Sequence, residues 1–253
     1  MDLAQLRVVQ LLAFVGSVAG ILSLIALWGS PYRITAMVLS VVLSVFALLL
    51  ETHRDRTSVF FAGVRKLYSS FPPEKNREVF KTVLNEYCYL GIGFTSVAST
   101  FRAWYESERK PNTRIRILLT DPDATDALEF QARYENNLFK SQLSQDEQQL
   151  IQQTVKRAQD GIRLTVDLIK TLSPASPPVE VRFHREKLRK WIHLVNGDSL
   201  YLGILRAGVS GLNSPTIVLK PVKKRWGLFD HHFEEFQTLW DCSASARTAL
   251  RDV

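Results

Sequence analysis

The chain has 253 residues, of which 46% are hydrophobic and 23% are charged, and its formal net charge is +7. The two cysteines, Cys88 and Cys242, exclude a disulfide framework and fit a reducing compartment. The sequence has no internal repeat and no low-complexity tract, and its basic balance favours anionic partners such as phosphates, lipid headgroups or nucleic acid.

Two apolar runs, residues 8–28 and 34–50, open the chain and are separated by the polar break 29–33. Neither run holds an ionised side chain, and the first is long enough to cross a bilayer core of roughly 30 Å at about 1.5 Å per helical residue. We therefore expect a two-helix transmembrane hairpin over residues 1–54. Buried core helices and a cleaved signal peptide are the alternatives, but the first run is too long for a signal peptide and no A-x-A site follows before the second run.

Basic residues follow the second run at Arg54, Arg56, Arg65 and Lys66, whereas the break between the runs offers only Arg33. Because lysine and arginine gather on the cytoplasmic side of a membrane, we expect both termini in the cytoplasm, as in a multi-pass membrane protein with two helices. Small residues spaced four apart in both runs would either close the hairpin on itself or join hairpins of different chains.

Residues 55–85 are expected to form a helical connector. Apolar residues at helical spacing predict an amphipathic helix over 58–71, which Pro72-Pro73 ends because proline lacks the backbone donor. A second helix is predicted over 74–86, and we expect its apolar stripe to pack against the core rather than lie on a membrane surface.

An α/β rhythm follows the connector. The continuous apolar run 87–94 predicts a strand buried on both faces, and Thr95-Ser96 is suited to cap the helix after it. Ser144 with Glu147 three residues later resembles a capping box. Two crossovers of this type predict a mostly parallel sheet with helices on its faces. The further elements predicted are a strand at 114–119, helices at 124–140 and 144–172, and a Pro/Ser linker at 173–178.

The second half of the chain reads as antiparallel structure. Apolar and polar residues alternate as in half-buried strands, and Asn196-Gly197 is a strong short hairpin signal. The elements predicted here are strands at 179–183, 190–195, 199–205 and 216–220, and a closing helix at 229–248.

This order of elements resembles the phospholipase D-like superfamily over roughly residues 86–243. The resemblance lies in the arrangement: strand, helix, strand and helix, then a strand, a hairpin whose second arm carries Gly203, another strand, and a last helix with the pattern Phe-x-x-Leu-Trp. Residues 114–123 also look like a strand and turn of bacterial members. The resemblance implies an α/β/α sandwich domain over residues 86–253, and a homodimer formed across the hairpin face.

The catalytic motif of that family is missing. Its hairpin holds H-x-K-x4-D, in which the histidine is the nucleophile and the other two residues surround the phosphate. With Asn196-Gly197 as the turn, Arg189, Trp191 and Asn196 occupy these positions. A guanidinium stays protonated and cannot attack, and a register shifted to His193 supplies neither the lysine nor the acid. We therefore expect no catalytic residue and no cofactor.

A binding role survives this loss because the same region is strongly basic and arginine fits phosphate oxygens in a bidentate way. A solvated basic face near an anionic membrane is an equally good explanation. Family sites lie at the carboxyl ends of the central strands, where hydroxyls and backbone N–H groups at a helix start can hold an anion, although helix capping alone also explains such hydroxyls. The candidate ligand-binding residues are Thr95, Ser96, Ser99, Arg189, Trp191, His193, Asn196 and Arg206.

No metal site is predicted. Asp121 and Asp123 flank a proline after a predicted strand, which is typical of a turn. The adjacent His231 and His232 point in different directions on a helix, and we expect no acidic or cysteine residue to complete a metal site with them.

The leading functional expectation is a membrane-anchored, non-catalytic sensor or effector. Its domain would bind a small anionic ligand, such as a nucleotide, and signal to the hairpin, as in bacterial antiviral defence by membrane disruption; this last step is analogy. The expected partners are the membrane, a second or further copy of the chain, and the ligand, with nucleic acid not favoured. The alternatives are a phosphodiesterase or nuclease that uses His184 or His193, and a membrane-tethered dimeric scaffold.

Overall fold

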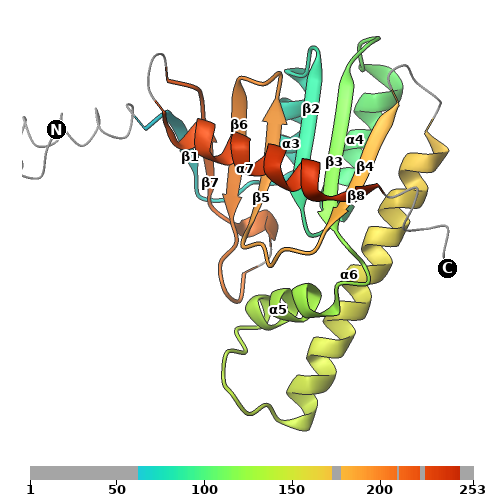
Figure 1. Cartoon of the computed structure of the whole chain (residues 1–253), viewed down its shortest axis with the longest axis vertical. Helices are drawn as coiled ribbons and strands as arrows, with labels where there is room; N and C mark the ends of the chain where they lie inside the picture. Colours follow the sequence, from blue (N-terminus) through green and yellow to red (C-terminus); the bar gives the residue numbers. More distant parts are fainter. Residues whose placement is uncertain (1–61, 173–177, 210, 223–225, 246–253) are drawn as a thin grey trace, which may run out of the picture. The chain divides into compact units, whose positions relative to one another are not determined.

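The computed structural model describes residues 62–172, 178–209, 211–222 and 226–245. They belong to one compact unit that begins near residue 61. Its centre is an eight-stranded mixed sheet with the strand order β1-β7-β6-β5-β2-β3-β4-β8. Helix α7 crosses one face of this sheet, whereas α3 and α4 lie behind the other face (Figure 1).

Two of the seven pairings between the described strands are parallel, so the predicted mostly parallel sheet is wrong: the two crossovers account for β2, β3 and β4 alone. Strand β2 (Glu86–Gly91) pairs with β3 (Arg114–Thr120), which pairs with β4 (Val179–His184). Strand β2 is a nearly continuous apolar run, buried on both faces because helices cover the two sides of the sheet, whereas apolar and polar residues alternate along β4. The two crossovers consist of α4 (Thr95–Ser107), between β2 and β3, and of α5 (Thr125–Glu135) and α6 (Gln145–Thr171), between β3 and β4.

The other half is antiparallel. Strand β5 (Lys190–Val195) pairs with β2 on one side and with β6 (Ser199–Ile204) on the other. Strand β7 (Thr216–Leu219) follows, after the short helix η1 (Gly211–Asn213). The two edges of the sheet are β1 (Val64–Tyr68), beside β7, and β8 (Ala244–Ser245), beside β4.

Two apolar cores lie on the two faces of the sheet. Alternation along β2 sends Tyr87 and Tyr89 into the larger core, with the helices α3 (Pro73–Lys81), α4 and α6. Cys88 and Leu90 point into the smaller core under α7 (Leu228–Cys242). The helices therefore form layers on both sides, and α6 extends beyond the end of the sheet, where α5 packs beside it (Figure 1).

Most elements predicted after residue 72 are confirmed, with shifted ends. The strands at 114–119, 190–195 and 216–220 are present, as is the hairpin turn at Asn196-Gly197. The capping box of α6 is also present, because the Ser144 hydroxyl accepts from the Glu147 N–H and the Glu147 carboxylate accepts from the Ser144 N–H. The closing helix is shorter than predicted, since it ends at Cys242 and the chain returns to the sheet as β8.

The amphipathic helix predicted over 58–71 is wrong where the structure describes it. Residues Val64–Tyr68 form β1, whose register pairs Leu67 with Ile217 and Tyr68 with Thr216 on β7. The spacing of apolar residues fits a helix, but β7 offers an open edge whose backbone groups need partners. The predicted connector thus supplies an edge strand and a core helix, α3, to the same sheet domain.

The predicted fold class also needs correction at its membrane part. The predicted transmembrane hairpin, residues 1–54, and its predicted orientation lie outside the described residues. Within the described ranges, no helix is both long and apolar enough to cross a bilayer. The structure therefore supports a mixed α/β domain and gives no support to a two-helix anchor.

Candidate functional site

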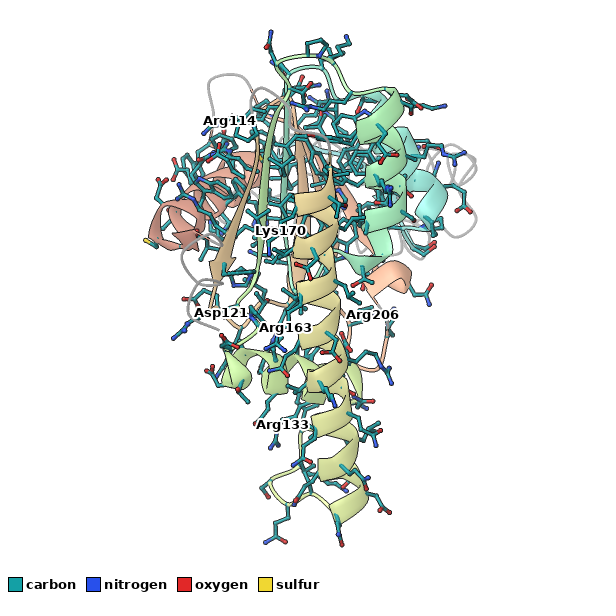
Figure 2. The ribbon with its side chains drawn as sticks, turned by 90° about the vertical axis from the view of Figure 1, so that its right-hand side faces the viewer. Arg114, Asp121, Arg133, Arg163, Lys170 and Arg206 are labelled. Atoms are coloured by element: carbon teal, nitrogen blue, oxygen red, sulfur yellow. The ribbon has the colours of Figure 1, made fainter. Side chains whose placement is uncertain are left out.

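A cavity of about 740 Å³ opens at the carboxyl end of β2. Its lining comes from the start of α4, from α5 and α6, and from β5 and the loop after β6. Figure 2 shows where this end of the sheet lies. Strand β3, which runs parallel to β2, begins at Arg114 at the top of the view and ends just before Asp121, at the level of Arg206. The volume of the cavity lies within the roughly 300–1,000 Å³ typical of small-molecule sites.

One wall of the cavity is aromatic. Trp191 lies 5.1 Å from Phe71 and 5.1 Å from His193, measured between ring centroids. Tyr89 lies 5.1 Å from His193, edge to face, and all four side chains line the cavity. Flat, apolar faces of this kind favour a planar ring as ligand.

Two glycines give these rings their places. A Cβ on Gly203, which pairs with Trp191 across the β5–β6 ladder, would lie 1.9 Å from Trp191 Cε2. A Cβ on Gly91 would lie 2.4 Å from the Tyr89 hydroxyl oxygen, which instead donates a hydrogen bond to the Gly93 carbonyl at 2.7 Å. Only glycine leaves room for the two rings at these positions.

His193 is a neutral, enclosed imidazole. It is 2% exposed, and its Nδ1 forms a 2.8 Å hydrogen bond with the Tyr87 hydroxyl. Burial lowers the pKa of His193 to about 3. A general base works best with a pKa near the working pH, so this environment suits a histidine that packs and hydrogen-bonds rather than one that takes protons.

His184, the other histidine considered for catalysis, does not line the cavity. It ends β4 and is buried, with Nδ1 accepting from the Glu186 N–H at 3.2 Å and Nε2 lying 3.5 Å from Thr120 Oγ1. Burial lowers the pKa of His184 to about 4. Both nitrogens face protein groups, so the imidazole is held in place as a structural element.

Two buried amides line the cavity with an oxygen left without a partner. Asn76 is 1% exposed and Gln131 is 5% exposed, and neither Asn76 Oδ1 nor Gln131 Oε1 has a hydrogen bond from any described group. The Gln131 nitrogen donates to Glu135 Oε1 at 3.0 Å, which fixes the direction of that amide. A buried acceptor without a donor costs about 1–3 kcal/mol. Each of the two oxygens exposes less than 1 Å², so a ligand donor would recover this free energy only after the amide turns towards the cavity.

The cavity also carries charges of both signs. The cations are Lys156, Arg157 and Lys190, and the carboxylates are Glu135 and Asp160. Lys190 is already neutralised, because its ammonium is paired with Glu235 of α7. The hydrogen bond from His232 and the charge of Lys190 lower the pKa of the Glu235 carboxyl to about 2.

That neighbouring cluster does not fit a metal ion. Ligand atoms of His231, His232 and Glu235 lie within 4.8 Å of one another. The Lys190 ammonium is, however, bonded to the Glu235 carboxylate and lies 3.4 Å from His232 Nδ1, so a cation would have to displace a cation. We interpret the cluster as an ion pair that positions Lys190.

The structure brings four of the eight predicted site residues together. Thr95, Ser96, Trp191 and His193 all line the cavity. Ser99 is exposed on α4 one turn after Ser96 and does not line it.

Arg189 does not line the cavity either. Its guanidinium lies 5.2 Å from the Phe130 ring and 5.3 Å from the Tyr134 ring, so it clamps α5 against the start of β5. Arg206 is exposed in the loop after β6, at the same end of the sheet as the cavity (Figure 2).

Asn196 lies at the other end of β5. Its Oδ1 accepts from the N–H groups of Leu84 at 2.8 Å and Asn85 at 3.2 Å, and its Nδ2 donates to the Thr82 carbonyl at 2.8 Å. Its φ of 54° suits the turn at which it stands. The structure therefore uses Asn196 to tie the hairpin to the loop after α3.

Sequence reasoning missed Asn76, Gln131 and Arg157, which also line the cavity. Single amides and arginines on the face of a helix form no motif, so no local signal distinguishes them from solvated surface residues. Only the packing of α3, α5 and α6 around one space identifies them.

Comparisons with known proteins are sparse. No family model and no curated protein matches the chain. Among solved structures, a phospholipase D family member, Nuc from Salmonella typhimurium, matches with 9% sequence identity and a TM-score of 0.38, over 71% of this chain and 97% of that chain. The neighbour belongs to the superfamily that the order of elements resembles, but a match at this score carries no argument about chemistry. We therefore interpret the site from its own residues.

Proposed function

We propose that this domain is a non-catalytic binding module for a nucleoside or nucleotide, with the base held in the aromatic cavity. The observation that carries the proposal is the pair of buried, unpartnered amide oxygens of Asn76 and Gln131 in a cavity walled by aromatic rings. A nucleobase is planar and presents N–H donors at its edge, so it suits both features.

The state of the histidines supports binding over turnover. His193 is the histidine that lines the cavity, and its pKa of about 3 makes it a weak base at neutral pH. A hydrolase that used His193 or His184 is therefore less well supported than a binding module. The signalling and defence roles expected from the sequence depend on the hairpin, so they are not part of this proposal. The homodimer stays a prediction.

Thermal unfolding of the full chain tests the proposal, in a mild detergent because of its apolar N-terminal residues. The ligands would be the four common ribonucleosides and their 5′-monophosphates, and the same samples would be assayed for hydrolysis. A ligand at about 100 times its dissociation constant adds about 2.7 kcal/mol to the free energy of unfolding. We expect at least one base to stabilise the chain without turnover.

The variant Gln131→Leu removes the unpartnered amide, and we expect it to weaken ligand binding about tenfold or more, since an unpaired ligand donor costs about 1–3 kcal/mol. Gln152→Leu makes the same chemical change at an exposed residue of α6 that does not line the cavity, and it should bind as the wild type does. Equal losses in both variants, or no stabilisation by any base, would refute the proposal. Hydrolysis that His193→Ala abolishes would favour the enzyme instead.

A further inference from the structure

The first turn of α4 offers backbone donors that nothing in the described chain uses. Its N-cap, Phe94, has no side-chain oxygen, and the first turn holds no acidic residue. The N–H groups of Val97 and Ala98 both point to the Phe94 carbonyl, whereas no described group accepts from the N–H of Thr95 or Ser96. A helix start in this condition carries partial positive charge and free donors.

These donors face the same cavity as the orphaned amides. Thr95 and Ser96 line it, and so does Asn76, which is 99% buried and whose Oδ1 has no partner among the described residues. The helix start is therefore one end of a space that already indicates a ligand on independent grounds. Tyr89 connects the two ends, because its ring belongs to the aromatic wall and its hydroxyl reaches the Gly93 carbonyl, two residues before Thr95.

A cation that has no ion pair within the described residues, Arg157, lies near this helix start. A Cβ on Gly161 would lie 3.0 Å from Thr95 Oγ1, so α6 passes directly beside the beginning of α4. Arg157 lies four residues before Gly161, on the same face of α6, and lines the cavity. The ion pairs that α6 forms among the described residues involve Glu147, Arg163, Asp167 and Lys170 and not Arg157. A planar guanidinium fits phosphate oxygens in a bidentate way.

The remaining charges that line the cavity leave Arg157 as the available cation. Lys190 is held by Glu235. Asp160 lies four residues after Lys156 and three after Arg157, helical spacings at which opposite charges attract, and it forms an ion pair with neither in the described part of the chain. Arg157, four residues before Gly161, shares the face of α6 that meets Thr95, whereas Lys156 does not. Glu135 accepts from the Gln131 amide on α5.

From these observations we infer that the ligand is a nucleotide and that its phosphate is bound by the first turn of α4 together with Arg157, with the base against the Trp191 and Tyr89 rings. This inference rests on the proposed binding function and specifies its ligand class. Backbone N–H groups at a helix start and an arginine fork are a common protein site for phosphate.

The variant Ser96→Asp separates the phosphate subsite from the fold and from the base subsite. An aspartate in the first turn stabilises a helix, so the full chain should melt at the same temperature as the wild type or higher. The same carboxylate repels a phosphate. We expect the 5′-monophosphate of the preferred base to lose at least tenfold in affinity, measured by calorimetry, while its nucleoside keeps its affinity.

The matched control is Ser99→Asp, which adds the same charge to an exposed position of α4 outside the cavity lining and should bind both compounds as the wild type does. Arg157→Gln should lower the affinity of the monophosphate alone. Inorganic phosphate serves as a second probe, which should weakly compete with the monophosphate and not with the nucleoside.

Three outcomes distinguish this inference from the proposed function. If the nucleoside binds wild-type protein as tightly as its monophosphate, the phosphate subsite is refuted and the base site stands. If Ser99→Asp lowers the affinity for the monophosphate as much as Ser96→Asp does, the loss comes from general charge repulsion, and the phosphate subsite is refuted. If neither compound binds wild-type protein, the proposed function fails, and the inference fails with it.

Discussion

Substituting Gly203 by alanine tests whether the hairpin places the aromatic wall of the cavity. The added Cβ would lie 1.9 Å from Trp191 Cε2 and 2.3 Å from two further indole atoms, whereas real Cβ contacts stay above 3.0 Å. The ring must therefore move by roughly 1 Å or more, against Phe71 and His193 packed beside it. Overpacking of this kind costs about 1–3 kcal/mol.

A double-mutant cycle isolates this contact. In a Trp191→Ala background the ring is absent, and Gly203→Ala should then gain about 0.5–1 kcal/mol, because alanine is the better strand residue. The expected coupling between the two positions is therefore about 1.5–4 kcal/mol.

Urea unfolding followed by far-UV circular dichroism would measure the free energy of unfolding of the wild type, the two single variants and the double variant. Gly93→Ala is the control, because its Cβ would meet only ordinary contacts at 3.8 Å, and it should be nearly neutral. If Gly203→Ala costs the same with and without the indole, the ring does not lie over the glycine and the reasoning about the cavity wall is refuted.

Three further predictions follow from single residues. Burial lowers the pKa of His193 from 6.5 to about 3, so the unfolded chain binds a proton that the folded chain does not, and stability should fall by about 1.4 kcal/mol per unit as the pH drops from about 6.5 towards 3. His193→Phe should reduce that slope by one proton in urea titrations from pH 7 to 4, and an unchanged slope would contradict the assignment. Asn196→Ala should lower the free energy of unfolding by about 1–3 kcal/mol in urea and leave nucleotide affinity unchanged. A large loss of affinity would show that Asn196 contacts the ligand. Arg189→Gln should cost about 1 kcal/mol through its contacts with Phe130 and Tyr134, and a tenfold loss of affinity in a stable variant would show that it touches the ligand.

Local patterns predicted most of the secondary structure because each pattern is set by near neighbours in the chain. The apolar run before Thr95 gave β2, and the capping box at Ser144 gave the start of α6. Asn196-Gly197 gave the position of the β5–β6 turn, and the tight turn over residues 196–198 fixes the register, in which Val195 faces Ser199.

Patterns of the same kind failed where a distant segment decides. Apolar residues between Val64 and Tyr68 fit a helix, but pairing with β7, far along the chain, makes this segment a strand. Asn196 was expected at a ligand, yet its side chain bonds to Leu84, 112 residues away, at the opposite end of the sheet.

The sequence by itself determined the two crossovers that make β2, β3 and β4 parallel, the hairpin, and the presence of hydroxyls at the start of α4, since these depend on local patterns along the chain. Only the tertiary structure decided that Trp191 folds over Gly203, that the amides of Asn76 and Gln131 meet around one space, and that Arg157 of α6 stands beside Thr95. The physical reason is that a cavity is made by side chains from several elements whose packing, unlike helix or strand periodicity, leaves no repeat in the order of the residues.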